Sequence, residues 1–286
     1  MSGTSSGPET GTNTEAGTAA DLPAAGLGSR TGTWLAGLGN QTRREASMWW
    51  ATSRWWRQAI IWSVLLGGIL AGMLWVFPGV LAGIEGADAV TMDVLEAAAQ
   101  FAELAAFVSA VGVVIICQGL LLDDDRLGLT EWLLSKPLSR PALVLAKLVG
   151  HASGVLFSIV LVPWTLAYVL LSVALGQAWP LGRFLGVVAL TALFVVFHLA
   201  LVLALSAVIG SRGAVLAIPL GLLVGADLLV GFVPATANWL PYLINRVAAA
   251  LLVSGEVVMV WPVIATVVYT LALTAVAVWR FDQREL

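Results

Sequence analysis

Long uncharged stretches constrain the fold of this chain more than any other feature of its sequence. A helix that crosses a bilayer needs about 20 predominantly apolar residues. Four such stretches lie between Arg57 and Glu85, Glu103 and Asp123, Lys147 and Arg183, and Arg183 and Arg212. The third of them is long enough to hold a loop at 176–180 as well as a span. Two more spans are expected over about 214–232 and 257–279.

The low proportion of charged residues agrees with this interpretation. Of the 286 residues, 59% are hydrophobic and 11% are charged, whereas a typical soluble domain carries about 25% charged residues. Such a chain cannot cover its surface with polar groups, so lipid must be the solvent for much of it. We therefore expect an all-α fold, a polytopic membrane protein with a six-helix transmembrane bundle.

The segment 234–256 bears on the number of crossings. It is apolar, but Pro234 and Pro241 break it, and Asn, Arg and Glu residues interrupt it. It could form a seventh crossing or short helices at the outer membrane face. Short helices are preferred, because an odd number of spans would place the basic C-terminal end outside the cell.

The basic residues predict the orientation. Lys and Arg favour the cytoplasmic side of a membrane. With six spans and the N-terminus inside, only Arg183 and Arg246 of the 14 Lys and Arg residues lie outside. We expect a protein of the cytoplasmic membrane with both termini in the cytoplasm.

The region before the first span divides into two parts. Residues 1–30 are rich in small and polar residues and contain no secretory signal, so 1–40 is expected to be a disordered cytoplasmic tail. Residues 41–58 are expected to form an interfacial amphipathic helix lying flat on the cytoplasmic face. The alternative is an N-terminal extension of the first span with an aromatic belt. Apolar side chains fall on one side of the helix and arginines on the other: Met48, Trp49, Trp55 and Trp56 against Arg43, Arg54 and Arg57.

The sequence contains none of the common motifs of enzymes or nucleotide-binding proteins. It has no Gly-x-x-x-x-Gly-Lys-Ser/Thr loop, no His-Glu-x-x-His and no Gly-x-Ser-x-Gly. His151 and His198 lie on different expected spans with no Cys or carboxylate near them in the sequence, so no metal site is expected. His198 is expected to face the bundle and bond a neighbouring helix. Cys117 is expected to be an inert core thiol. The net charge of −3 gives no indication of nucleic-acid binding.

Asp227 is the one carboxylate inside an expected span. Charged groups within the membrane are costly and are functional candidates by default. Asp227 could line a passage or bond a nearby helix, or it could lie near a wet outer vestibule. An ion-coupled secondary transporter that uses Asp227 is therefore an alternative function.

The longest cytoplasmic loop, 123–147, is the most informative segment. Gly128 ends the helix that leaves the second span, and Thr130 can cap a short new helix that Pro137 stops. Ser139 then caps a second helix that continues into the third span. Leu129, Trp132 and Leu133 are expected to form one apolar face. This rigid element suits docking to a soluble partner, although packing on its own bundle is an equally good reading of the residues alone.

The same loop carries a pattern that resembles the permease subunits of type-2 ABC exporters. The six spans, the helix before the first span and the C-terminal end over 281–286 agree with that family. On this resemblance, 59–286 is the transmembrane permease domain and 123–147 its coupling loop. The matching residues are Asp125, Arg126, Gly128, Leu133, Leu134, Ser135, Pro137, Ser139, Arg140 and Lys147.

The resemblance implies a transport subunit that is not itself an enzyme and that moves an unidentified substrate. A separate ABC ATPase would bind ATP and Mg, and no cofactor would be bound by this chain. Two permease copies or homologues, two ATPases and membrane lipids would be the partners, with spans two and five near the dimer axis. Asp125 and Arg126 would lie at the start of the coupling helix, in position to pair with the ATPase or with the flat helix. That helix would consist of Gly128, Leu129, Thr130, Glu131, Trp132, Leu133, Leu134 and Ser135.

Overall fold

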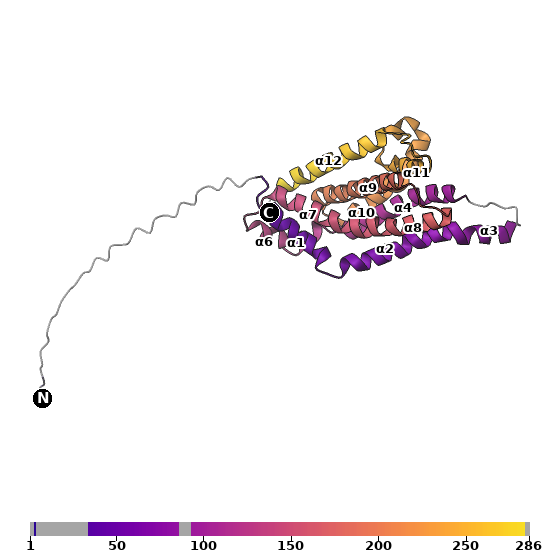
Figure 1. Cartoon of the computed structure of the whole chain (residues 1–286). Coiled ribbons are helices and arrows are strands. Elements are labelled where there is room, and N and C mark those ends of the chain that lie inside the picture. Colours follow the sequence, from indigo (N-terminus) through magenta and orange to yellow (C-terminus); the bar gives the residue numbers. More distant parts are fainter. Residues whose placement is uncertain (1–2, 4–33, 86–92, 284–286) are drawn as a thin grey trace. The chain divides into compact units, whose positions relative to one another are not determined.

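The computed structural model describes residues 3, 34–85 and 93–283, and every regular element in this part of the chain is a helix. Six helical segments are long and apolar enough to cross a membrane, which agrees with the expected number (Figure 1). Of the expected tail, 1–40, residues 1–2 and 4–33 lie outside the described residues, and 38–40 belong to the helix Leu38–Trp50. The six segments are Arg54–Val80, Val94–Arg126, Arg140–Leu175, Leu181–Val208, Arg212–Phe232 and Trp261–Asp282.

The first three segments are built from several elements each. A short helix, α1 (Leu38–Trp50), precedes them, and α6 (Leu129–Leu134) joins the second to the third. The first segment contains α2 (Arg54–Ala71), a π-helical turn η1 (Gly72–Val76) and α3 (Phe77–Glu85); the second contains α4 (Val94–Cys117) and α5 (Leu122–Arg126); the third contains α7 (Arg140–Val155), the π-helical turn η2 (Leu156–Leu161) and α8 (Val162–Leu175).

Both π-helical turns end two positions before a proline. Phe77 separates η1 from Pro78, and Val162 separates η2 from Pro163. A proline ring clashes with the carbonyl of the preceding turn and donates no hydrogen bond, so the helix widens there instead of breaking. The first and third spans each keep one continuous path across the bundle for this reason.

The last three spans are α9 (Leu181–Val208), α10 (Arg212–Phe232) and α12 (Trp261–Asp282). Between α10 and α12 the chain forms η3 (Pro234–Trp239), η4 (Pro241–Leu243) and α11 (Ile244–Ser254). These elements are the short helices that the two prolines predict, and α11 is too short to cross a bilayer.

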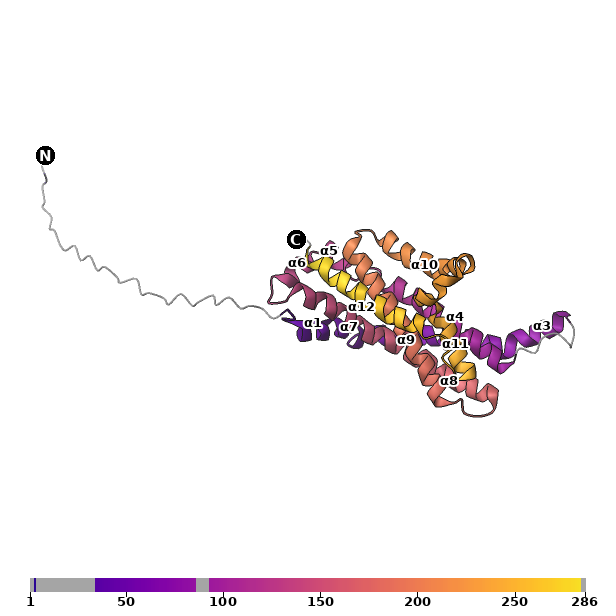
Figure 2. The same cartoon turned by 90° about the horizontal axis from the view of Figure 1, so that it is seen from above.

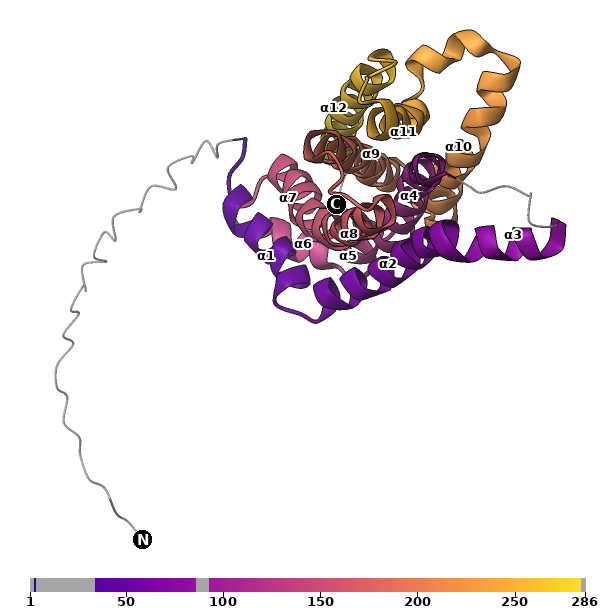
Figure 3. The same ribbon diagram turned by 45° about the vertical axis from the view of Figure 1, so that its right-hand side comes forward.

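The helix α9 forms the centre of the bundle. It packs against α4, α7, α11 and α12. In its apolar stretch of 18 residues, 67% is buried inside the protein, a larger share than in any other span. Figure 3 shows α9 between α12 and α11 on one side and α7 on the other. The helix α2 packs along α8, and α1 packs along α7. In Figure 2 the helix α10 lies along a different side of the bundle from α8.

Three distant parts of the chain meet at one end of the bundle. The backbone N–H of Ser139 donates to the carbonyl of Ala36 at 3.1 Å, and its hydroxyl donates to the carbonyl of Trp34 at 2.6 Å. The guanidinium of Arg140 donates to the carbonyl of Asp282 at 2.6 Å. The start of α1, the loop after α6 and the end of α12 therefore share one end, as an even number of spans requires (Figure 1).

Several sequence-based expectations differ from the structure. The single helix expected over 41–58 is interrupted at residues 51–53, so Arg54 already belongs to the first span. The second span starts at Val94 rather than after Glu103, because a helix can carry Glu103 on its surface. His198 is buried as expected, but its Nδ1 bonds the carbonyl of Phe194 in its own helix at 2.8 Å, not a neighbouring helix.

Candidate functional site

The connection between the second and third spans folds into two short helices at a sharp angle. Gly128 separates α5 from α6 and has a φ of +65°, a left-handed conformation that glycine adopts readily. The Thr130 hydroxyl donates to Oδ1 of Asp125 at 2.6 Å. Thr130 therefore lies inside α6 and ties it to α5, instead of capping α6 as expected.

Two neighbouring apolar side chains of α6 differ in burial. Leu133 is 3% exposed and packs with Leu143 and Val144 of α7, whereas Trp132 is 52% exposed. The expected single apolar face of α6 is thus divided between the bundle and the surface. One turn of helix is held by the bundle and presents a tryptophan outward.

The third span begins as the sequence predicts. The Ser139 hydroxyl accepts a hydrogen bond from the backbone N–H of Ala142 at 3.3 Å, and Pro141 occupies the first turn of α7. Two turns later, Lys147 points into the protein. Its Nζ lies 2.6 Å from Oδ2 of Asp124 in α5 and 3.6 Å from Oε1 of Glu45 in α1.

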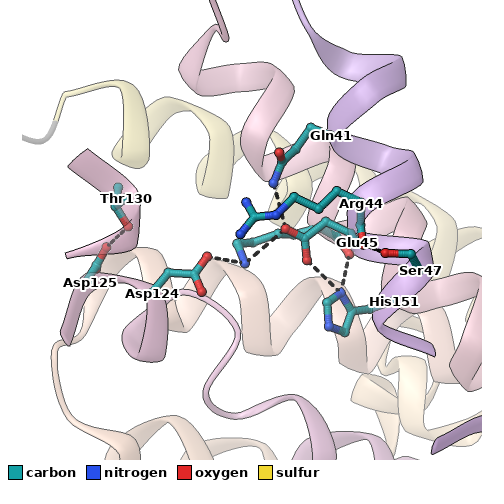
Figure 4. A network of polar contacts seen from close by, with 9 residues as sticks. Gln41, Arg44, Glu45, Ser47, Asp124, Asp125, Thr130 and His151 are labelled. Carbon is teal, nitrogen blue, oxygen red and sulfur yellow. Dashed lines mark hydrogen bonds and ion pairs between the residues drawn. The ribbon is translucent and has the colours of Figure 1, made fainter. Parts of the chain in front are cut away.

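Glu45 is the centre of a buried polar network that joins three helices (Figure 4). Gln41 donates to its Oε1 at 2.8 Å. Its Oε2 lies 3.7 Å from Nδ1 of His151, which also bonds the carbonyl of Lys147 at 3.1 Å. Glu45 and Lys147 are each 2% exposed. Charges this deeply buried are tolerated only when they are paired, so removing one member leaves the others uncompensated.

Small residues in α7 allow α1 to approach closely enough for this network. Ala146, Gly150 and Gly154 follow one another at four-residue intervals and form a stripe on α7. A Cβ at Gly150 would lie 2.5 Å from Cβ of Glu45, and one at Gly154 would overlap the ring of Trp49. Trp49 is fully buried by this packing, so the structure places it inside the protein rather than on the surface of α1.

A groove of about 290 Å³ lies between α1 and α6 on the outer side of this network. Trp132 is one of its lining residues, and two cations lie near its ring. Nζ of Lys136 lies 3.6 Å from the ring centroid, and the guanidinium carbon of Arg44 lies 5.9 Å from it. The groove therefore presents an aromatic ring and positive charge together.

The structure brings some of the predicted site residues together and separates others. Lys147 joins the network through Asp124, whereas Asp125 bonds Thr130, and Arg126 is exposed.

Of the residues predicted before the first span, Arg43, Trp56 and Arg57 are exposed, and Trp55 is half-buried against Trp50 and Phe157. Ser135 bonds the carbonyl of Trp132, and Pro137 is exposed. The side chains of Glu131, Leu134 and Asp227 lie outside the described part of the chain; Asp227 itself belongs to α10.

Glu45, Asp124 and Gln41 were not predicted from the sequence. A signal for two of them exists, because Gln41, Glu45 and Trp49 follow at four-residue intervals and share one face of α1. A single helical projection across 41–58 does not reveal that face, because the helix is interrupted at 51–53. Nothing near Asp124 in the sequence indicates that it, rather than Asp125, pairs with Lys147.

The network does not form a metal centre. Within residues 34–85 and 93–283, no group of three or more His, Cys, Asp or Glu side chains is placed to hold an ion. The carboxylate closest to His151 comes from Glu45, more than a hundred residues earlier in the chain. The side chains of the network are paired with one another and come from three helices. A displacement of one of these helices can therefore be transmitted to the others.

Comparison with known proteins gives one family. Residues 79–286 match the model of a family described as ABC-2 family transporter protein. The match covers most of the chain and includes α6 and the five spans from the second to the sixth. No curated protein matches the sequence.

Proposed function

Since the chain belongs to the ABC-2 family of transporter proteins, we propose that it moves a substrate across the cytoplasmic membrane with ATP hydrolysed by a separate subunit. The chain is a multi-pass membrane protein and a permease component, not a catalytic subunit. It binds no cofactor itself, and ATP is handled by a partner ATPase.

The observation that carries the proposal is the double attachment of α6. Its outer side presents Trp132 at 52% exposure. Its inner side is held by Leu133 and by the bond between Thr130 and Asp125. A soluble protein that grips Trp132 would therefore pull on α5 and, through Asp124 and Lys147, on the third span. This arrangement suits a coupling helix that transmits movement from an ATPase.

The chemistry of the groove suggests which partner surface fits. Trp132 offers a large apolar ring, and Arg44 and Lys136 place positive charge near it. An apolar cleft with carboxylates at its rim would match both features. We propose that the ATPase presents such a cleft to α6.

The orientation is proposed from charge. The end of the bundle that holds α1, α6 and the end of α12 also carries most of the Lys and Arg residues, which favour the cytoplasm. An ATPase that uses cytoplasmic ATP must dock on that side. A second permease copy would complete the transporter, with the spans containing α4 and α10 near the dimer axis.

The proposal is tested by capture of the partner. The full chain is tagged, extracted in a mild detergent and purified from the cells that express it. We expect a copurifying protein with a Gly-x-x-x-x-Gly-Lys-Ser/Thr loop and ATPase activity, and we expect Trp132→Glu to lose it. Capture that is unchanged by Trp132→Glu would contradict docking at α6, and recovery of the chain alone would contradict the ATPase partner.

A further inference from the structure

A second cavity lies next to the buried polar network around Glu45, which contributes Asp124, Lys147 and His151 to its wall. It has a volume of about 320 Å³, near the lower limit of small-molecule sites. Arg54 of α2, Lys147 and His151 of α7, and Arg212 of α10 contribute to its wall, with Ile115 and Ile116 of α4 beside them. Four spans therefore line one cavity, and the carboxylates of Asp123 and Asp124 also belong to its wall.

The three cations of the wall differ in their partners. Lys147 is paired with Asp124 and Glu45, and Arg212 is paired with Asp123. Among the described residues, no carboxylate lies within ion-pair distance of Arg54, and its guanidinium donates no hydrogen bond. A guanidinium carries five N–H donors in a fixed plane. Arg54 thus brings an uncompensated charge and several donors to the cavity.

Trp49 fixes the position of that charge. The guanidinium carbon of Arg54 lies 4.3 Å from the ring centroid of Trp49, which is fully buried between α1 and α7. Stacking on an aromatic face leaves the edge of the guanidinium plane available, and the edge is the part that binds carboxylate or phosphate oxygens in pairs. The arginine is therefore preorganised to receive an anion.

The depth of the cavity indicates the kind of anion. Arg54 and Arg212 are the first residues of two spans, so their side chains lie at the membrane interface, where lipid phosphates lie. Ile115 is largely exposed next to the cavity, toward the interior of the span. A ligand that joins a phosphate to an acyl chain matches the charge at one end and the apolar surface at the other.

We propose that this cavity is a binding site for the phosphate of an anionic phospholipid, held by the edge of the Arg54 guanidinium with an acyl chain along α4. The site requires the chain to lie in a membrane but does not require an ATPase partner. Its occupancy would couple lipid composition to the network, because Lys147 and His151 belong to both.

The test measures lipid binding to the purified full chain by native mass spectrometry. Phosphatidylglycerol and phosphatidylcholine with the same acyl chains are titrated separately. We expect phosphatidylglycerol to bind at least about tenfold more tightly, and Arg54→Gln to remove about tenfold or more of that affinity. The matched control is Arg57→Gln, one turn along α2, because Arg57 is exposed, bonds the carbonyl of Ser53 and does not line the cavity.

Two more variants keep the test informative if Arg54→Gln unfolds the protein. Arg54→Lys keeps the charge and loses the fork of donors, so an intermediate affinity is expected. Met48→Glu places a competing carboxylate in the wall at a position that is 45% exposed, and should weaken binding without loss of packing. Thermal unfolding verifies that each variant is folded.

Three results would overturn the proposal. Equal losses in Arg54→Gln and Arg57→Gln would indicate a diffuse basic surface. Equal affinity for the two lipids would show that the site does not select an anionic head. Displacement of phosphatidylglycerol by millimolar inorganic phosphate would show that the acyl chain contributes nothing and that the site takes a free anion.

Discussion

Nζ of Lys147 lies 2.6 Å from Oδ2 of Asp124, and this contact joins the third span to the segment that leaves the second. Glu45 reaches the same ammonium from α1 at 3.6 Å. The helices α1, α5 and α7 therefore share one buried positive charge, and α1 is far from the other two in the sequence. The stability of this end of the bundle should depend on that charge more than on any exposed ion pair.

Removal of the shared charge is the first prediction. Lys147→Met leaves the carboxylates of Glu45 and Asp124 without their shared cation. The free energy of unfolding should therefore fall by about 3–5 kcal/mol. Unfolding of the purified chain in detergent, followed by tryptophan fluorescence, measures the loss. Lys136→Met is the control, because Lys136 is exposed. The double variant Glu45→Gln with Lys147→Met should recover part of the loss. Equal effects of the two lysine substitutions would contradict the prediction.

The glycine stripe of α7 gives a second prediction. Gly154→Ala places a methyl group on the ring of Trp49 and should destabilise the protein by about 1–3 kcal/mol. The matched control is Gly68→Ala in α2, where a Cβ would meet nothing within 4 Å and alanine improves helix propensity. The midpoint of thermal unfolding should fall in the first variant only. A fall of the same size in both would show that the approach of α1 is not limited by Gly154.

The exposed tryptophan of α6 gives a third prediction, which rests on the proposed function. Trp132→Glu should abolish copurification of the ATPase and leave the thermal stability of the chain nearly unchanged, because half of the side chain is already exposed. Trp132→Phe should retain the partner. Trp239→Glu, at a tryptophan of η3 that is 62% exposed, should retain it as well. Loss of the partner in both glutamate variants would show a general effect of charge.

Asp227 distinguishes the proposed function from an ion-coupled transporter. In an ATP-driven permease, Asp227→Asn should leave the ATPase rate of the captured complex in proteoliposomes within about twofold of the unmodified complex. A secondary transporter would instead show ion uptake by the chain alone, lost in Asp227→Asn. A pH-sensitive dye inside the same vesicles measures that uptake when the ion is a proton.

Tyr242 gives a prediction about stability at the other end of the bundle. Burial raises the pKa of its hydroxyl, which therefore stays neutral at physiological pH. That hydroxyl has no hydrogen-bond partner among the described residues, so Tyr242→Phe should leave the free energy of unfolding unchanged or raise it. Tyr168→Phe should lower it by about 0.5–1.5 kcal/mol, because the Tyr168 hydroxyl donates to the carbonyl of Trp179 at 3.3 Å. Chemical unfolding of both variants compares them directly.

The sequence predicts the spans well because a bilayer imposes a length and an apolar composition on every crossing helix. The cap at Ser139 and the turn at Gly128 are also predictable, since each depends on local geometry. The loop 123–147 could be recognised as a unit for the same reason. These are the features that neighbouring residues determine.

The buried network could not be predicted, because it depends on contacts between distant segments. Lys147 gives no indication in the sequence of whether it faces solvent, lipid or a carboxylate. Its partner Glu45 lies among exposed arginines, and only the packing of α1 on α7 turns Glu45 inward. The break at residues 51–53 has the same origin, since the chain must turn there for Trp49 and Arg54 to face one another.

The packing of α1 on α7 also has a consequence for biogenesis. Trp50 of α1 donates to Ser153 of α7, its partner 103 residues later in the chain. At a synthesis rate of about 5–20 residues per second, α1 leaves the ribosome roughly 5–20 s before α7 does. During that interval Glu45 and Trp49 have no place to be buried. The nascent protein must therefore keep α1 in the cytoplasm or in the lipid headgroups until the third span is inserted.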